Sequence, residues 1–419
     1  MTTLHDQKVI SRRLALKPTL VVISGALLMA GLTVRTGVVA VTRLNAPTIA
    51  LTLDPSDARA QAQLAEKMIA SDPASATNAV RLARNAIVRE PSLVTALRTV
   101  AIYEALQNRP GRAVALLTQA SHASKGDVGS QVLLIEAAVA RNDIPTALYH
   151  YDIALRSSRD AAPLLFPPLI RASDEKSIML PLTDYLATNP AWKDGYLLEL
   201  VQHGPSPVEI MSLLLRLKAR GLPAGANIVI PFVNRFIAAG DIVQARQVFQ
   251  TLLDPTPLDR LRDPSFRRTA PPTPFDWALV QSYGLTVTPG PTEIGPGISI
   301  SASPDCCGEV VGQLVMLPRG HYVLRWRKRV LNRELSGRAE WTITCQSVDK
   351  RTVLSVPVAA NLDDTPDEQM FEIPMGCSAQ RVALRIQPGE DALSLIIAGV
   401  SLTRDVSARS AANERALRR

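Results

Sequence analysis

Aromatic side chains are scarce in this chain of 419 residues, in which phenylalanine, tryptophan and tyrosine together make up only 4%. This scarcity argues against a wholly β-structured protein, because strands are enriched in aromatic residues. It does not indicate disorder, since 47% of the residues are hydrophobic and 20% are charged. A chain of this length and composition is expected to form two or three domains, with stacked helices rich in alanine and leucine among them.

Recognisable catalytic motifs are also lacking. The five histidines are dispersed, and the sequence holds no nucleophile elbow, phosphate-binding loop, dinucleotide fingerprint or paired zinc-ligand helix. We interpret an acidic stretch as a solvated turn in preference to a calcium site; it consists of Asp363, Asp364, Asp367 and Glu368. We therefore predict that the protein is not an enzyme, and we assign it no catalytic residue, no cofactor and no metal ligand.

A basic stripe with interleaved aromatic residues is a third absence. The net charge is +8, but much of the excess of lysine and arginine lies at the two ends of the chain. Between the ends the charges are scattered, as on an ordinary solvated surface. The sequence therefore does not predict nucleic-acid binding.

A long uncharged segment near the amino terminus predicts a membrane anchor. Residues 18–34 read PTLVVISGALLMAGLTV and are bounded by Lys17 and Arg35. A helix of about 17 residues is at the lower limit for crossing the hydrocarbon core. The arginine head group can extend to the interface, which lengthens the usable span toward residue 41. We predict a cytoplasmic tail over residues 1–17 and a transmembrane anchor over residues 18–41.

The flanking charges set the direction of this anchor. Four basic residues and one acid precede it, so the positive-inside rule keeps the amino terminus in the cytoplasm. The expected location is a bacterial inner membrane, crossed once, with the bulk of the chain in the periplasm. A cleaved signal peptide is the alternative, because the small residues of VVA at 38–40 suit signal peptidase. The bulk of the chain is exported in both cases.

Small residues return at an interval of 34 over residues 57–161, and a further copy follows later. The alanines that mark the second helix of each copy are Ala79, Ala86, Ala113, Ala120, Ala147, Ala154 and Ala245. Only a small side chain fits where two helices approach closely, and a single helical hairpin cannot bury its own apolar face. The spacing therefore predicts stacked hairpins, which form an all-α solenoid over residues 42–254.

The repeat resembles the tetratricopeptide repeat family, whose consensus has these two alanines and a proline after the second helix, as at Pro91. Lys67 and Ile135 depart from the small residue that is usual in the first helix. The resemblance implies a curved scaffold whose concave face binds peptide segments or partner proteins. Candidate groove residues, which helical spacing more often places in a core, are Tyr103, Tyr149 and Tyr151.

The pattern changes at residues 255–274, where several prolines end the helices and predict a linker. Beyond them, short runs such as GISISAS, HYVLRWR, EWTITCQ and QRVALRI alternate with a period of two. These runs predict an all-β sandwich over residues 275–405, followed by a disordered basic tail over residues 406–419. Trp326 and Trp341 share faces with aliphatic neighbours, so we expect them in the core.

The sandwich sequence resembles a jelly-roll domain of the carbohydrate-binding-module type. It is also similar to the carboxy-terminal part of exported repeat proteins from polysaccharide gene clusters of proteobacteria. Besides the segment LPRGHYVLRW, the residues that carry the resemblance are Phe275, Asp276, Trp277, Gln313, Cys345, Cys377 and Gln380. The resemblance implies a glycan ligand, bound through exposed aromatic residues or calcium-holding loops.

All four cysteines lie in the predicted sandwich. Cys345 and Cys377 lie on or beside separate predicted strands, and an even count in an exported domain favours disulfides, so we predict that they are bonded. Cys306 and Cys307 are adjacent, which leaves three states open: a strained vicinal disulfide, intermolecular pairing or two free thiols. Adjacent cysteines also lack the spacing of a zinc site.

These features lead to one principal hypothesis and two alternatives. The principal hypothesis is a non-enzymatic periplasmic scaffold, anchored in the membrane through residues 18–41. It binds envelope proteins through its repeats and a polysaccharide through its sandwich, in exopolysaccharide assembly or export. The alternatives are a carbohydrate-active enzyme with its site in the sandwich and a pure structural spacer.

Overall fold

The computed structural model describes residue 29 and residues 33–267, 273–331, 338–346, 350–358 and 366–405. The chain divides into two compact units, Met1–Trp192 and Lys193–Arg419. The predicted tails at residues 1–17 and 406–419 and most of the predicted anchor lie outside the described residues. Within the described part, no helix has the length and apolar character needed to span a bilayer.

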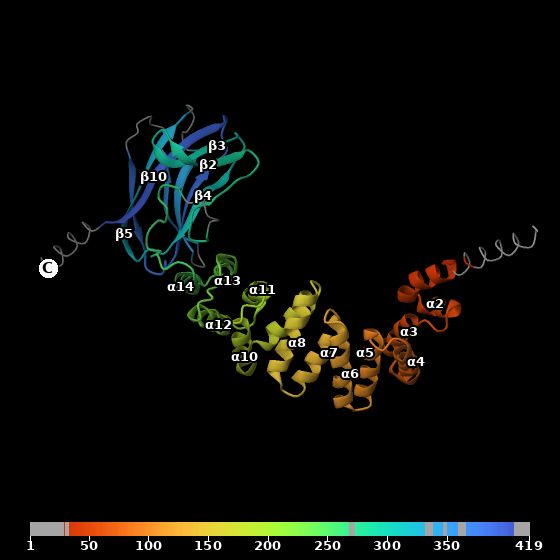
Figure 1. Cartoon of the computed structure of the whole chain (residues 1–419). Coiled ribbons are helices and arrows are strands. Elements are labelled where there is room, and N and C mark those ends of the chain that lie inside the picture. Colours follow the sequence, from red (N-terminus) through yellow and green to blue (C-terminus); the bar gives the residue numbers. More distant parts are fainter. Residues whose placement is uncertain are drawn as a thin grey trace, which may run out of the picture. The chain divides into compact units, whose positions relative to one another are not determined.

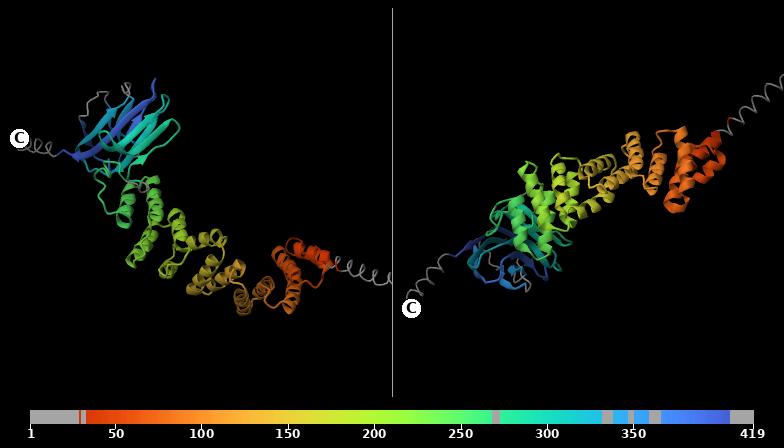
Figure 2. Two further views of the ribbon diagram at one scale, coloured as in Figure 1. Left: turned by 45° about the horizontal axis from the view of Figure 1, so that its top comes forward. Right: turned by 90° about the horizontal axis from the view of Figure 1, so that it is seen from below.

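The first unit is helical in its described part (Figures 1 and 2). A helix over residues 33–45 precedes the others. These are α2 (Pro47–Leu53), α3 (Ala58–Ser71), α4 (Ala76–Arg89), α5 (Val94–Leu106), α6 (Pro110–Ala123), α7 (Val128–Val139), α8 (Ile144–Ser157), α9 (Ala161–Ala172) and α10 (Lys176–Leu186). Helices α3 and α4, α5 and α6, and α7 and α8 pack as hairpins, and each hairpin also contacts the next.

The turns of these hairpins repeat with the sequence. Asn108 and Asn142, which lie 34 residues apart, both adopt the left-handed backbone conformation, with φ of 58° and 55°. Asparagine tolerates this conformation better than most residues, which explains why the helices turn there. Asp127 and Asp143 immediately precede α7 and α8 and cap them, because their carboxylates accept hydrogen bonds from backbone N–H groups of the first turn.

The alanines that define the repeat all lie inside the packed helices. The seven residues from Ala79 to Ala245 have exposed fractions between 0% and 5%. In the first hairpin, Ala79 and Ala86 belong to a core cluster that also contains Ala62 and Ala65 of α3. This burial of small side chains on both helices lets their backbones approach closely.

The second unit begins with four helices and continues as two sheets. The helices are α11 (Lys193–His203), α12 (Pro207–Ala219), α13 (Ala226–Ala238) and α14 (Ile242–Leu252). The strands are β1 (Ala278–Leu279), β2 (Leu285–Thr292), β3 (Gly295–Ala302), β4 (Gly308–Val315), β5 (Gly320–Val330), β6 (Ala339–Cys345), β7 (Thr352–Pro357), β8 (Asp367–Ile373), β9 (Gln380–Ile386) and β10 (Leu393–Arg404). The unit boundary thus falls inside the predicted solenoid and joins the last helices to the sandwich.

The strands form two five-stranded sheets, in the orders β1-β4-β9-β6-β7 and β2-β3-β10-β5-β8. Every strand pair described is antiparallel. Side chains from both sheets share one core, which includes Val311, Trp341 and Leu384 from the first sheet and Leu324 and Ile397 from the second. This is the predicted β-sandwich, and Trp341 has no exposed surface.

The proline-rich segment is packed where the structure describes it. Leu258, Leu261 and Phe266 are 2–7% exposed, and the N–H of Met316 donates to the carbonyl oxygen of Leu258 at 2.7 Å. Prolines prevent a helix here, but the apolar residues between them still find places against the sandwich. The segment therefore fastens the helices to the sheets.

The acidic stretch differs from the predicted solvated turn. Asp367 and Glu368 lie at the start of β8, beside β5. The carboxylate of Asp367 binds the buried ammonium of Lys328, and Glu368 Oε2 lies 2.8 Å from Arg325 Nε. Charges on the neighbouring strand turn these acids into ion-pair partners, a relation that depends on strand pairing. The other two acids of the stretch, at positions 363 and 364, lie outside the described residues.

Candidate functional site between the last helices and the sandwich

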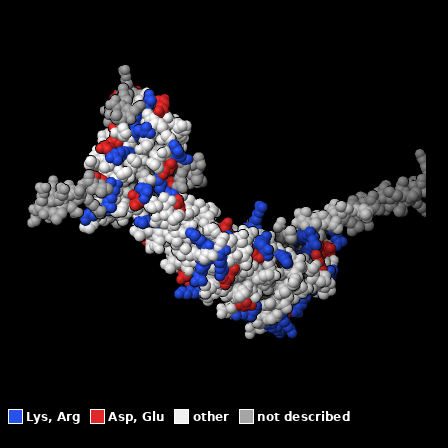
Figure 3. All heavy atoms as spheres, turned by 60° about the vertical axis from the view of Figure 1, so that its left-hand side comes forward, with Lys and Arg blue, Asp and Glu red and all other residues white. Residues whose placement is uncertain are grey.

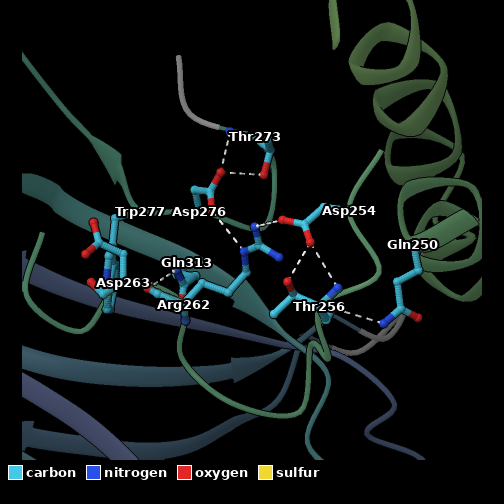
Figure 4. A network of polar contacts seen from close by, with 9 residues as sticks. All are labelled: Gln250, Asp254, Thr256, Arg262, Asp263, Thr273, Asp276, Trp277 and Gln313. Atoms are coloured by element: carbon cyan, nitrogen blue, oxygen red, sulfur yellow. Dashed lines mark hydrogen bonds and ion pairs between the residues drawn. The ribbon is translucent and has the colours of Figure 1, made fainter. Parts of the chain in front are cut away.

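Arg262 lies at the centre of a buried polar network between α14 and the sandwich (Figure 4). Its Nε donates to Asp276 Oδ1 at 2.9 Å, and its Nη2 donates to Asp254 Oδ2 at 2.6 Å. The guanidinium carbon also lies 5.2 Å from the ring centroid of Phe249 in α14. The side chain of Arg262 is only 6% exposed, so this one residue ties the end of α14 to the segment before β1.

The carboxylates of this network are held in their charged form. Burial raises the pKa of Asp276, but hydrogen bonds from Thr273 and Arg262 outweigh burial, and the net pKa lies below its usual value. Asp254 follows the same pattern, with Thr256 and Arg262 holding its pKa well below the ordinary range. Burial also lowers the pKa of Arg262, and its two carboxylate partners more than compensate.

Residues that carry the sandwich resemblance surround this network. The ring of Phe275 lies 4.9 Å from that of Phe249, and Trp277 Nε1 donates to the carbonyl oxygen of Asp263 at 3.1 Å. Gln313 Oε1 accepts the N–H of Arg262, and Gln313 Nε2 donates to the carbonyl oxygen of Arg262, both at 2.9 Å. These side chains bind the packed segment to β1 and β4.

Gln380, in β9, also binds backbone groups of neighbouring segments through its side-chain amide. Its Oε1 accepts the N–H of Leu317 at 2.8 Å, and its Nε2 donates to the carbonyl oxygen of Cys377 at 2.7 Å. Cys377 is bonded to Cys345, with a Cα–Cα distance of 5.4 Å, which is the predicted pair. Apart from the segment LPRGHYVLRW, the residues that carry the resemblance are thus buried and fasten the unit together.

A hollow of about 780 Å³ lies between the α13–α14 hairpin and the sandwich. On the helical side it is lined by Asn234, Ile237 and Ile242. On the sheet side it is lined by Ala278, Leu314 and Arg381. Three further residues, from the segments beside the strands, complete its polar lining: Gln346, Lys350 and Ser378.

Small residues leave space on the sheet side of this hollow. Ala278 in β1 lies opposite Gly312 in β4. A Cβ on Gly312 would lie 2.2 Å from Glu309 Oε1 and 2.7 Å from Arg381 Nη2. Because Glu309 and Arg381 form an ion pair over this position, any larger side chain would displace the pair.

A second hollow of about 290 Å³ adjoins the first, and Ser378 lines both. Its lining includes Arg246 of α14, Arg319 of the β4–β5 connection and Met375, which is 82% exposed. We call the two hollows together the junction groove. Amides, hydroxyls, cations and apolar carbons all face it, a mixture typical of sites for polar organic ligands.

Elsewhere on the molecule, charged side chains of both signs are mixed (Figure 3). On the face drawn in Figure 3, basic and acidic side chains are interspersed over both the helices and the sandwich. This face carries no extended stripe of one sign, in keeping with the scattered charge of the sequence.

The remaining candidate residues are dispersed. Tyr149 is 52% exposed, whereas Tyr151 is buried at 7%, and Tyr103 packs beside the core of the first hairpin with Arg84 6.0 Å from its ring centroid. Trp326 is 2% exposed, as predicted for a core residue. Among the described residues, no three acidic, histidine or cysteine side chains gather to hold a metal ion.

Cys306 and Cys307 are both free thiols in the structure, the first buried and the second exposed. They lie in the connection between β3 and β4, and neither is among the residues that line the junction groove.

The sequence did not indicate the groove residues. Lys350 and Arg381 are ordinary surface residues in a linear pattern, and their shared environment arises only when β9 lies beside the helical hairpin. One further feature is invisible in the sequence: Lys350 adopts a left-handed backbone conformation, with φ of 42°. Non-glycine residues in this conformation are often found at functional positions.

No protein-family model and no curated protein matches this chain. Three solved structures illustrate what it is similar to in part. A carbohydrate-binding module described as "CBM4 structure and function" has 12% identity and a TM-score of 0.29, over 35% of this chain and 99% of that one. YrrB, described as a TPR protein with an unusual peptide-binding site, has 14% identity and a TM-score of 0.27, over 50% of this chain and 92% of that one. TmCBM61 in complex with β-1,4-galactotriose has 14% identity and a TM-score of 0.23, over 31% of this chain and 88% of that one.

These neighbours include both a helical-repeat protein and carbohydrate-binding modules. At such identities and scores they say nothing about which ligands this chain binds.

Proposed function

We propose that this protein is a non-enzymatic scaffold that is anchored in a bacterial inner membrane and exposed to the periplasm. Its helical repeats hold an envelope protein, and its sandwich, a jelly roll, holds a glycan. The role that fits this combination is the assembly or export of an exopolysaccharide.

The observation that carries the glycan half of this proposal is the hollow of about 780 Å³ beside the sandwich. Its volume falls in the range of small-ligand sites, roughly 300–1,000 Å³. Asn234, Gln346 and Ser378 offer amide and hydroxyl groups, while Ile237 and Leu314 offer apolar carbon. A sugar ring presents the matching combination, with hydroxyl groups at its rim and C–H groups on its faces.

The stacked hairpins support the protein half. Hairpins that bury their alanines against one another leave an extended surface for a partner, as helical-repeat arrays generally do. Exposed apolar side chains such as Tyr149, Leu106 and Val139 lie on the helices of the first unit, with 52–55% of their surface exposed. These side chains are available for contacts with a partner chain.

Isothermal titration of the full-length protein in lipid nanodiscs, against neutral and acidic oligosaccharides, tests the glycan half. Asn234 and Asn227 are exposed asparagines on the same helix, and only Asn234 lines the hollow. We expect Asn234→Trp to weaken glycan binding by about tenfold and Asn227→Trp to change it less than about twofold. Release of a sugar product during the titration would contradict a non-enzymatic role.

Location is tested separately in cells that produce the full chain. We expect the protein to sediment with membranes and to be digested by a protease added to spheroplasts. Protection of the sandwich from that protease would contradict periplasmic exposure.

A further inference from the structure

Basic side chains line both hollows of the junction groove. Lys350 and Arg381 line the larger hollow, and Arg246 and Arg319 line the smaller one. Among the described residues that line either hollow, none is an aspartate or a glutamate. A concave site with charges of one sign attracts ligands of the opposite sign more strongly than a flat surface does.

These basic side chains differ in whether they form an ion pair with an acidic side chain. Arg381 is paired with Glu309, so it contributes mainly position and hydrogen-bond donors. Lys350 and Arg319 are exposed, and the described residues give neither of them an ion pair. Arg404 adds further positive charge, because its Nη2 donates to the carbonyl oxygen of Arg319 at 3.0 Å.

We infer that the junction groove selects an acidic glycan, in which uronic-acid carboxylates pair with Lys350 and Arg319 while the sugar rings lie in the two hollows. This inference rests on the proposed function, since it names the class of glycan that the sandwich unit holds. Carboxylates match these donors well, because an ammonium or guanidinium forms charge-assisted hydrogen bonds with them. The apolar carbon of Leu314 and Ile237 beside the cations favours a sugar over a bare inorganic anion.

The test is a titration of the full-length protein in nanodiscs with four acidic glycans: oligogalacturonate, oligomannuronate, oligoguluronate and a hyaluronan hexasaccharide. Each is paired with its methyl ester, which keeps the sugar backbone and removes the charge. Poly-glutamate serves as an acidic peptide of similar charge. We expect at least one acidic glycan to bind about tenfold more tightly than its ester, and this preference to shrink as salt screens the charges.

Matched double variants locate the binding. Lys350→Gln with Arg319→Gln removes two charges from the groove, and Arg385→Gln with Arg260→Gln removes two exposed charges elsewhere in the unit. The first pair should reduce the preference for the acid over the ester by about tenfold, and the second by less than about twofold. All four positions are exposed, so the thermal midpoint of each variant should match that of the parent.

The outcomes separate this inference from the proposed function. If every glycan that binds does so equally tightly as acid and as ester, or if both double variants behave alike, the groove does not select acidic glycans although the glycan function stands. If none of the acids and none of the esters binds, this inference fails, and the glycan half of the proposed function fails with it only when the neutral oligosaccharides do not bind either. Tighter binding of poly-glutamate than of every glycan would overturn the inference in favour of an acidic protein partner.

Discussion

Arg262 joins the end of the helices to the sandwich through its buried side chain. Asp276, its partner, is 6% exposed in its side chain, so removal of the guanidinium takes the charge of Arg262 away from a buried carboxylate. We expect Arg262→Met to lower the free energy of unfolding of this unit by about 3 kcal/mol. Urea denaturation followed by tryptophan fluorescence measures it, because Trp277, Trp326 and Trp341 all belong to this unit.

The control for this prediction lies two residues away. Arg260 is 65% exposed and pairs with its exposed neighbour Asp259 at 3.4 Å. Arg260→Met should change the free energy of unfolding by less than about 0.5 kcal/mol. Equal effects of the two substitutions would show that the buried network contributes no more than a surface pair.

Acid should weaken the same network. The pKa values of Asp254 and Asp276 are lower in the folded protein than their ordinary values. A depressed pKa gives stability that is complete above about pH 5, where the unfolded carboxylates are also ionised. That stability is lost as the pH falls further and the folded carboxylates take up protons. The urea midpoint should therefore drop between pH 4 and pH 2.5, and less steeply in Arg262→Met, where the carboxylates no longer pair with Arg262.

The adjacent cysteines differ in exposure, and this predicts different reactivity. Cys306 is 8% exposed, whereas Cys307 is an exposed free thiol. We expect iodoacetamide to label Cys307 in the folded, unreduced protein at least about tenfold faster than Cys306, since burial shields a thiol from the reagent. Mass spectrometry of peptides measures both rates. Failure of both cysteines to react before reduction would instead indicate that they are bonded to each other or to another chain.

At the scale of the helix, the repeat alanines should tolerate no added volume. Ala120 in α6 has no exposed surface, whereas Ala115 on the same helix is exposed. Ala120→Leu should destabilise the first unit by about 1–3 kcal/mol through overpacking, while Ala115→Leu should be nearly neutral. Circular dichroism during urea denaturation checks both. Similar costs at the two positions would mean that close helix approach is not what these alanines provide.

The elements that the sequence predicts well are those with a short-range signal. The alanine interval locates the hairpins from α3 to α8, and the alternation with a period of two locates β3, β5, β6 and β9. Asp367 and Glu368 were harder to interpret, because their partners Lys328 and Arg325 lie on another strand and become neighbours only through pairing in the sheet.

The candidate site could not be derived from sequence for the same reason. Its lining comes from α13, α14, β1, β4, β9 and the segments beside the strands, and no interval along the chain relates these positions. The residues that the sequence did single out, such as Gln313 and Gln380, are distinctive because they satisfy buried backbone groups. A conspicuous residue in a single sequence can therefore mark a packing constraint as readily as a binding surface.

At the scale of the whole molecule, the boundary between the two units predicts which fragments fold. The proline-rich segment suggests a domain boundary directly before the sandwich. In the structure, however, Leu258, Leu261 and Arg262 of this segment pack into the second unit. A fragment over residues 193–405 retains α14 with Phe249, Asp254 shortly after that helix, and this packed segment. A fragment over residues 272–405 loses all of them and leaves Asp276 without Arg262.

We therefore expect the longer fragment to unfold in one cooperative transition and the shorter one to bind the dye ANS and to melt at least about 10 °C lower. A loss of a few kcal/mol from a unit of this size is enough for such a shift. Differential scanning calorimetry of both fragments measures it, and a fragment over residues 42–192 should unfold in a transition of its own. If the shorter fragment were as stable as the longer one, the helices would be only attached to the sandwich, and the junction groove would lack the rigid walls that a selective site needs.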